Sequence, residues 1–232
     1  MIVYGRNVAK EILKNDKKIK KITLLENFDD KEIISLIEKR KIRVEYLNKK
    51  SFSKFDKFSH QGIILDIEDF SYSDYSSFFE DENAKVVILD HLEDPHNLGA
   101  IIRTCEAAGI TGVIIPKDRS VDINSTVMKT SAGALENVKI SKVTNLVSVI
   151  NELKENGFWI VGTAMENAVD YRDIDYTGKF ALVIGNEGKG MSKAVMNECD
   201  YIAKIPMYGK INSLNASVAT GIMIYEMISL DK

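Results

Sequence analysis

The sequence predicts an α/β protein that folds as two domains, and three observations support this. Short apolar segments such as 86–89 and 181–184 alternate with segments of helical periodicity, which is typical of a parallel sheet covered on both faces. Hydrophobic residues at 45% and charged residues at 28% are ordinary for a globular protein, and 232 residues suffice for one large domain or two ordinary ones. The composition also changes over residues 68–83.

Residues 1–67 form the first predicted domain, a small α/β unit. Apolar residues at helical spacing predict a helix over 29–40, and a shorter helix follows over 49–55. Short strands are predicted around these helices, at 21–25, 44–47 and 63–67.

Residues 68–83 (EDFSYSDYSSFFEDEN) are rich in Ser, Asp, Glu and aromatic residues and have no clear period, which indicates a linker. Residues 84–232 form the second predicted domain. Its strands are expected at 86–89, 113–115, 158–163, 181–184 and 201–205. Its helices are expected at 97–108, 145–156, 192–198 and 214–228.

The distribution of charge is uneven, although the net charge is only −3. Residues 1–70 hold 16 Lys and Arg against 12 Asp and Glu, and the basic residues are densest over 10–21 and 39–43. Phosphate binding requires a local basic face, whatever the total charge of the protein. A solvated helix face explains the same pattern equally well.

The two cysteines, Cys105 and Cys199, are too few for a disulfide framework and lack the spacing of a metal site, so we expect no metal. No apolar run reaches the roughly 18 residues of a membrane span, and the sequence opens without a signal-peptide pattern. We therefore expect a cytoplasmic protein with no membrane partner.

Three polar, glycine-containing segments each follow a predicted strand, which is where ligands bind in open α/β sheets. The first segment spans residues 89–109. Asn97 is placed to cap its helix, and Gly99 permits close approach of another backbone. Arg103 lies on an otherwise apolar stretch, so it needs either an anionic ligand or an internal acidic partner.

The second segment, 181–192, places Glu187 among Gly185, Gly188 and Gly190. This spacing differs from the dinucleotide pattern, and Lys189 is not followed by the Ser or Thr of a phosphate-binding loop. A nucleotide-dependent enzyme is therefore disfavoured. A plain tight turn and a ligand site that uses the Glu187 carboxylate both remain open.

The third segment, 205–226, opens a helix with Ser213 and Asn215 on either side of apolar Leu214, an arrangement that suits a ligand pocket. The small residues Ala219 and Gly221 indicate ordinary close packing of that helix.

In this order, the three segments resemble the SpoU/TrmH class of RNA ribose 2′-O-methyltransferases, part of the SPOUT superfamily. The first and second family motifs are matched by Asn97, Gly99 and Arg103, and by Gly185, Glu187, Gly188 and Gly190. The third is matched by Ile205, Pro206, Met207, Ser213, Leu214, Asn215, Ser217 and Ala219.

The chain is most similar to the subgroup that methylates a guanosine in the peptidyl-transferase P loop of 23S ribosomal RNA. The subgroup elements are present as Tyr4, Gly5, Asn7 and Val8, as His60-Gln61-Gly62, and over residues 94–97 and 113–120. A transfer RNA 2′-O-methyltransferase of the same family and a non-catalytic RNA-binding or ribosome-assembly protein on this fold remain as alternatives.

The resemblance implies a C-terminal SPOUT domain with a deep trefoil knot, and an N-terminal domain similar to the ribosomal-protein L30e/L7Ae type that grips RNA. It implies S-adenosylmethionine as the cofactor, a homodimer packed through the helix at 215–228, and no DNA partner. The residues implicated in holding the cofactor are Thr163, Ala164, Gly185, Ile205, Met207 and Leu214.

The resemblance also implies roles for five catalytic residues. Arg103 would orient the ribose hydroxyl and stabilise its developing charge, because an arginine guanidinium stays protonated and is an unlikely base. Asn97 would position Arg103 or the ribose, and Glu187 would fix the loop. Ser213 and Asn215 would complete the pocket.

Overall fold

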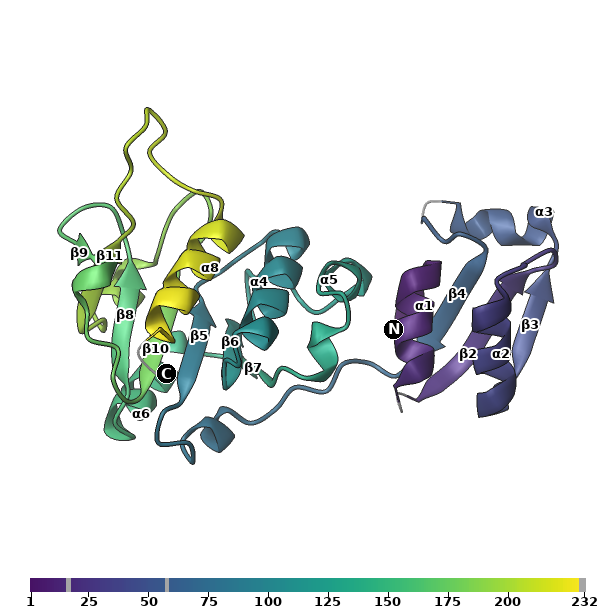
Figure 1. The fold of residues 1–232 in the computed structure, drawn as a ribbon, viewed down its shortest axis with the longest axis horizontal. Coiled ribbons are helices and arrows are strands. Elements are labelled where there is room, and N and C mark those ends of the chain that lie inside the picture. The colour runs from purple at the N-terminus through teal and green to yellow at the C-terminus, as the bar shows by residue number, and fades with distance from the viewer. Residues whose placement is uncertain (16–17, 57–58, 230–232) are drawn as a thin grey trace. The chain divides into compact units, whose positions relative to one another are not determined.

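The structure, a computed structural model, describes residues 1–15, 18–56 and 59–229, which form two compact units (Figure 1). Unit 1 comprises Met1–Ser71 with Ile123–Gly133, and unit 2 comprises Tyr72–Asp122 with Ala134–Lys232. The segment Ile123–Gly133, expected in the second domain, contains α5 (Ser125–Thr130), which lies against the first strand of unit 1. A six-residue helix is too short for its own sequence pattern to reveal which unit it joins.

Unit 1 is a four-stranded sheet in the order β1-β4-β2-β3. Its strands are β1 (Ile2–Tyr4), β2 (Ile19–Leu25), β3 (Val44–Leu47) and β4 (Ile63–Ile67). Its helices are α1 (Arg6–Lys14), α2 (Lys31–Arg40), α3 (Lys49–Phe52) and a 3₁₀ turn at Ser53–Phe55. The helices α1 and α2 pack against each other (Figure 1). The sequence did not predict β1, because a three-residue strand has too few positions to show alternation. The helix α1 was also not predicted, although its buried residues Val8, Ala9, Ile12 and Leu13 stand at helical spacing.

Unit 2 is built on a seven-stranded sheet in the order β7-β6-β5-β10-β8-β11-β9, in which every paired neighbour is parallel. Its strands are β5 (Lys85–Leu89), β6 (Gly112–Pro116), β7 (Ile140–Val143), β8 (Trp159–Thr163), β9 (Val169–Asp170), β10 (Phe180–Ile184) and β11 (Tyr201–Lys204). The α/β class and the parallel sheet predicted from the sequence are confirmed.

Helices cover both faces of this sheet. They are α4 (Pro95–Ala107), α6 (Leu146–Glu155), α7 (Lys193–Met196) and α8 (Ala216–Met227), with 3₁₀ turns at Tyr75–Phe78, Ala134–Glu136 and Tyr171–Asp173. The helices α4 and α8 pack side by side on one face (Figure 1), whereas α6 and α7 share a core cluster with the other. Every residue of β5, β6 and β10 is buried, which explains why these strands read as continuous apolar runs.

The predicted linker, residues 68–83, is divided between the two units: residues 68–71 belong to unit 1 and residues 72–83 to unit 2. Phe78 is fully buried in the core cluster, and a Cβ on Gly112 of β6 would lie only 2.2 Å from the Phe78 ring. The Tyr75 hydroxyl also donates to Glu152 Oε2 at 2.7 Å. Single aromatic residues anchor this segment, and such anchors leave no periodic signal in the sequence.

Within the described residues, no helix is long and apolar enough to cross a membrane. The same residues contain no group of three or more His, Cys, Asp and Glu that could hold a metal ion.

Candidate active site

The three polar segments follow β5, β10 and β11, and they meet at the carboxyl edge of the unit 2 sheet. The Asn97 side chain joins them, because its Nδ2 donates to Glu187 Oε1 at 3.0 Å and its Oδ1 accepts from Asn215 Nδ2 at 2.9 Å. Asn97 itself is buried, with 6% of its surface exposed, whereas Glu187 and Asn215 are exposed. One residue from each predicted motif therefore takes part in a single hydrogen-bond chain.

Asn97 is not the N-cap of its helix, in contrast to the expectation from sequence. Asp94 caps α4, with Oδ1 accepting from the His96 N–H at 2.8 Å, and Pro95 occupies the first turn. Proline at this position has no N–H to satisfy and its φ suits a helix start, so the cap falls one residue before it. Asn97 thus lies inside the helix, and its amide is available for the two motif residues.

Asn215 caps α8 and bonds Asn97 at the same time. Its Oδ1 accepts from the Ser217 N–H at 2.9 Å and from Ser217 Oγ at 2.6 Å, while its Nδ2 reaches Asn97. The Asn215 side-chain amide therefore caps the N-terminus of α8 and links its first turn to α4.

Replacing Asn97 by alanine is expected to lower the free energy of unfolding by about 1–3 kcal/mol, because two hydrogen bonds worth roughly 0.5–1.5 kcal/mol each are lost. Urea unfolding followed by circular dichroism measures the change. Asn137→Ala is the matched control, since Asn137 Nδ2 also donates to a carboxylate, Glu106 Oε1 at 3.2 Å, but on the exposed surface. Equal stability of the two variants would contradict a structural role for the two Asn97 hydrogen bonds.

The glycine-containing loop after β10 turns back tightly on itself. A Cβ at Gly185 would lie 2.2 Å from the Met191 backbone nitrogen, so only glycine fits there. The Asn186 Oδ1 accepts from the N–H groups of Gly188 at 2.9 Å and Lys189 at 3.1 Å. Asn186 had no assigned role in the sequence, although an Asn followed two residues later by Gly is a turn signal that could have identified it.

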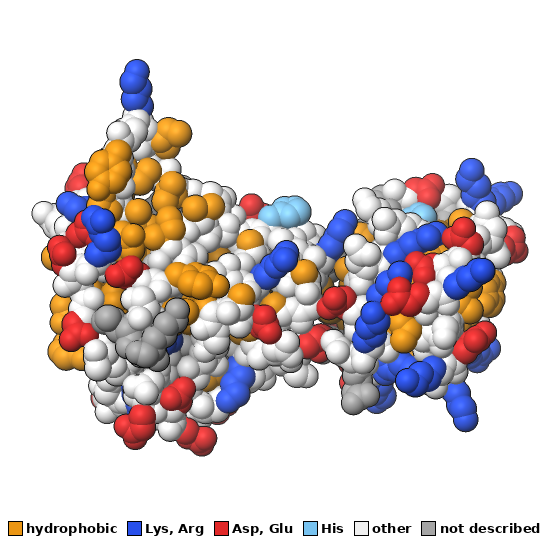
Figure 2. Space-filling model, in the orientation of Figure 1, with side chains coloured by type: hydrophobic (Ala, Val, Ile, Leu, Met, Phe, Trp, Pro, Cys, Tyr) orange, Lys and Arg blue, Asp and Glu red, His pale blue; other side chains and the backbone are white. Residues whose placement is uncertain are grey.

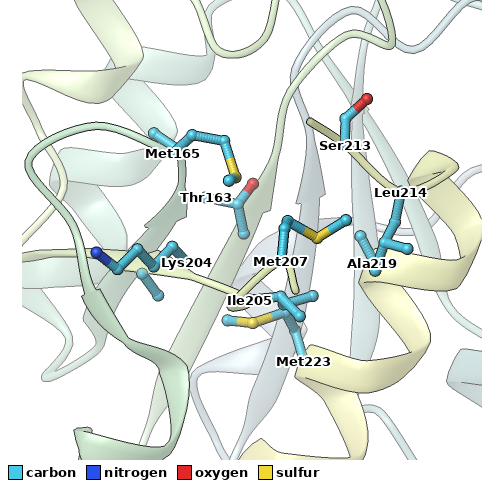
Figure 3. A pocket seen from close by; sticks show the side chains of 11 residues that line it. Thr163, Met165, Lys204, Ile205, Met207, Ser213, Leu214, Ala219 and Met223 are labelled. Carbon is cyan, nitrogen blue, oxygen red and sulfur yellow. The ribbon is translucent and has the colours of Figure 1, made fainter. Parts of the chain in front are cut away.

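An apolar cavity of about 150 Å³ lies between the ends of β8 and β11 and the start of α8 (Figure 3). It is lined by Thr163, Ala164, Met165, Ala203, Lys204, Ile205, Met207, Ser213, Leu214, Ala219 and Met223. Figure 3 shows Thr163 and Met165 facing Leu214 and Ala219 from the opposite side. Of the predicted cofactor-binding residues, all but Gly185 line this cavity, and Gly185 acts in closing the loop.

The cavity can hold a flat heterocycle with an apolar surface. Its walls are mainly aliphatic and thioether side chains, and within the described residues the N–H groups of Ile205, Met207 and Leu214 donate to no other residue. Apolar walls with a few free backbone groups are the usual environment of a bound adenine. Ala219, which was expected only to pack against a neighbour, also lines the cavity. Gly221 does pack against α4, because a Cβ at this position would lie 3.8 Å from Thr104 Cγ2.

Arg103 is exposed on α4, and in the part of the chain that the structure describes its guanidinium contacts no carboxylate and no hydrogen-bond acceptor. The internal salt bridge, the alternative left open by the sequence, is therefore absent from these residues. The structure does not bring Arg103 into contact with Asn97 or Glu187. An exposed guanidinium without a partner can bind a phosphate or a developing oxyanion.

The two cysteines do not contribute a nucleophile. Burial raises the pKa of the Cys105 thiol far above its usual range and that of Cys199 to about 12. Neither side chain holds a significant thiolate fraction at neutral pH, which is the form that would react.

Two family profiles match most of the chain. Residues 84–225 match the SpoU rRNA Methylase family, and residues 2–73 match the family of RNA 2′-O ribose methyltransferase substrate-binding domains.

Individual proteins resemble the chain along nearly its whole length. A Staphylococcus aureus (strain COL) protein provisionally named TrmH family tRNA/rRNA methyltransferase is 43% identical over 97% of this chain and 94% of the relative. The structure of an AdoMet-bound rRNA methyltransferase from Sinorhizobium meliloti is 28% identical, with a TM-score of 0.82 over 99% of this chain and 87% of that chain. The SpoU methyltransferase AviRb from Streptomyces viridochromogenes, in complex with AdoMet, shares the fold at 23% identity, with a TM-score of 0.84 over 100% of this chain and 90% of that chain.

Proposed function

The chain belongs to the SpoU/TrmH family of RNA methyltransferases, and from this membership we propose that it methylates a ribose 2′-hydroxyl in RNA. The proposal rests on the hydrogen bonds that join Glu187, Asn97 and Asn215 near the apolar cavity. These bonds bring all three family motifs together at one edge of the sheet. The cofactor is S-adenosylmethionine, and the cavity lined by Thr163 and Leu214 is its binding site.

When bound, the cofactor would supply a methyl group on its sulfonium. The ribose oxygen would bond to the methyl carbon as the carbon–sulfur bond breaks, the neutral thioether would leave, and the hydroxyl proton would pass to water. A ribose hydroxyl is a weak nucleophile, so the protein must stabilise the charge that develops on its oxygen. Arg103 performs this role and also binds the adjacent phosphate, because its guanidinium is exposed and has no partner in the described structure. Asn97 and Glu187 hold the loop that faces the reacting groups, and Ser213 completes the cavity wall.

The substrate is a guanosine in the P loop of 23S ribosomal RNA. Residues 2–73 match a substrate-binding domain, and the motif matches to the ribosomal RNA subgroup extend into that domain. Transfer RNA is the alternative substrate, because the S. aureus relative is named for both RNAs.

Unit 1 binds RNA through only part of its basic surface. Lys10, Lys14 and Lys21 form ion pairs with Glu32 or Glu45, so they act as a solvated, paired face. A second group of basic residues is exposed and, among the described residues, has no ion pair. These are Lys39, Lys41, Arg43, Lys49 and Lys50. This second group is free to contact phosphates.

Methyl transfer from radiolabelled S-adenosylmethionine to unmodified 23S ribosomal RNA and to bulk transfer RNA tests the proposal. Label recovered from 23S RNA as 2′-O-methylguanosine supports it in full. Label in transfer RNA alone keeps the reaction and overturns the substrate. Cofactor binding without transfer to either RNA or to assembling ribosomal subunits favours a non-catalytic RNA-binding protein.

The functional molecule is a homodimer in the cytoplasm, with a trefoil knot in unit 2. Large apolar side chains gather over the segment between β11 and α8 and along α8 (Figure 2). In the segment before α8, Tyr208 is 90% exposed and Ile211 is 73% exposed. Val218 and Tyr225 stand seven residues apart, on the same face of α8, and each is about half exposed. A second copy of the chain would cover this surface. The knot is supported by β10, which enters the sheet between β5 and β8.

Placing carboxylates on this face is expected to separate the dimer. The double variant Val218→Asp/Tyr225→Asp should raise the dissociation constant by about 10²-fold or more, because an unpaired buried charge costs several kcal/mol. Light scattering after size exclusion at micromolar concentration measures the mass. Tyr46→Asp is the matched control, since Tyr46 is 57% exposed on β3 of unit 1 and is not part of α8 or of the segment before it. A wild-type monomer would refute the dimer.

A further inference from the structure

A second cavity, of about 300 Å³, lies at the same edge of the unit 2 sheet, over the ends of β5, β6 and β10. It shares no lining residue with the cofactor cavity. Its polar lining includes Asp90, His91, Glu93, Arg119, Asn186 and Lys189. The volume lies at the lower end of the range for small-ligand sites, roughly 300–1,000 Å³.

The floor of the second cavity is held by buried hydrogen bonds. Asp90 is 1% exposed, with Oδ2 accepting from the Ser192 N–H and Oδ1 lying against His91 Nδ1, each at 2.5 Å. Asn186 Nδ2 donates to the His91 carbonyl at 2.8 Å and to Glu93 Oε1 at 3.4 Å. His91 has a φ of 61°, a conformation that few non-glycine residues adopt, and these contacts keep it there.

The second cavity presents donors and acceptors together. Arg119 follows β6, and within the described residues its guanidinium has no acceptor. Glu93 Oε1 receives one long hydrogen bond from Asn186, and Oε2 accepts none from the described residues. The cavity therefore offers a free guanidinium and a carboxylate to the same ligand.

Guanine matches this pair of groups. It carries acceptors at O6 and N7, which an arginine contacts through two parallel hydrogen bonds. It carries donors at N1 and N2, which a carboxylate accepts, and proteins read such edges in unpaired RNA bases. Adenine has an amino donor where guanine has O6, and it lacks a proton at N1.

We propose that the second cavity holds the guanine base of the target nucleotide, with Arg119 on its O6/N7 edge, Glu93 on its N1/N2 edge and His91 against the ring. This inference rests on the proposed function. The loop supports it, because Asn186 and Lys189 line the second cavity while Glu187, between them, bonds Asn97 of the catalytic chain. A base held on one side of the loop leaves its ribose near the motif residues on the other.

The first test compares single-turnover methyl transfer to the target RNA with guanosine or inosine at the methylated position. Inosine lacks only the 2-amino group that Glu93 would bind. The wild-type enzyme should prefer guanosine by about 10–100-fold, the range of a hydrogen bond to a charged group. Glu93→Gln should lose most of this preference, and Arg119→Ala should slow both substrates about equally. Lys139→Ala, an exposed cation before β7 that lines neither cavity, should behave like the wild type.

The second test does not depend on methyl transfer. Saturation-transfer NMR with guanosine and adenosine 5′-monophosphates reports binding of the base when saturating S-adenosylmethionine fills the apolar cavity, and cofactor binding confirms that each variant is folded. A guanosine signal that exceeds the adenosine signal and falls in Glu93→Gln supports the second cavity, even when neither RNA is methylated. Equal signals for the two nucleotides, or equal rates for guanosine and inosine in the wild type, overturn it.

Discussion

Arg103→Ala is expected to lower the single-turnover rate of methyl transfer by about 10²–10³-fold, the usual effect of removing one group that stabilises a developing oxyanion. The rate is measured with saturating S-adenosylmethionine and RNA. Arg103 is exposed and, in the described structure, unpaired, so the variant should unfold at the wild-type urea concentration. A loss of rate without a loss of stability separates a chemical role from a structural one.

Two further variants sharpen this prediction. Arg103→Lys keeps the charge but loses the planar fork, so an intermediate rate is expected if the guanidinium contacts both hydroxyl and phosphate. Lys193→Ala removes an exposed cation from α7, on the opposite face of the sheet, and should leave the rate unchanged. Near-normal turnover of Arg103→Ala would remove Arg103 from the mechanism.

Gly185→Ala is expected to disrupt the loop that carries Glu187. The new Cβ would lie 2.2 Å from Met191 N and 2.3 Å from Gly190 C, and both are backbone atoms that move only with the whole loop. Such crowding costs about 1–3 kcal/mol of unfolding free energy. A displacement of about 1 Å in the loop is expected to slow methyl transfer by roughly 10²-fold.

Gly188→Ala is the matched control for stability in the same loop. Its Cβ would meet only Asn186 Oδ1, at 3.7 Å, an ordinary contact. Urea unfolding should therefore separate the two glycine variants by at least about 1 kcal/mol. Equal stability would mean that the loop relaxes around Gly185 at little cost.

The elements of unit 2 were largely predictable because their signals are local. The runs at 86–89 and 181–184 are continuous and apolar since both faces of their strands are covered, and they lie within β5 and β10. The segment 72–83 was not predictable in the same way. Its burial depends on Phe78 filling a space beside Gly112, which is 34 positions away in the sequence.

The candidate site divides along the same line. The sequence identified Asn97, Glu187 and Asn215 as motif residues, but it assigned Asn97 to a helix cap and gave Asn186 no role. The Asp94-Pro95 pair explains the first difference, since proline favours the first helical position and therefore places the cap at Asp94, three residues before Asn97. No local pattern in the sequence joins the residues of the second cavity, because Glu93, Arg119 and Asn186 follow three different strands.

By itself, the sequence determined the chemistry available to this protein, namely which polar and small residues follow which strands, and the family to which they belong. The tertiary structure decided which of these residues meet. Asn97 bonds Glu187 across 90 positions and Asn215 across 118, and both contacts exist only because β10 pairs with β5 and α8 packs against α4. Hydrogen bonds act over about 3 Å, so partners distant in sequence are set by strand order and helix packing, which local spacing does not encode.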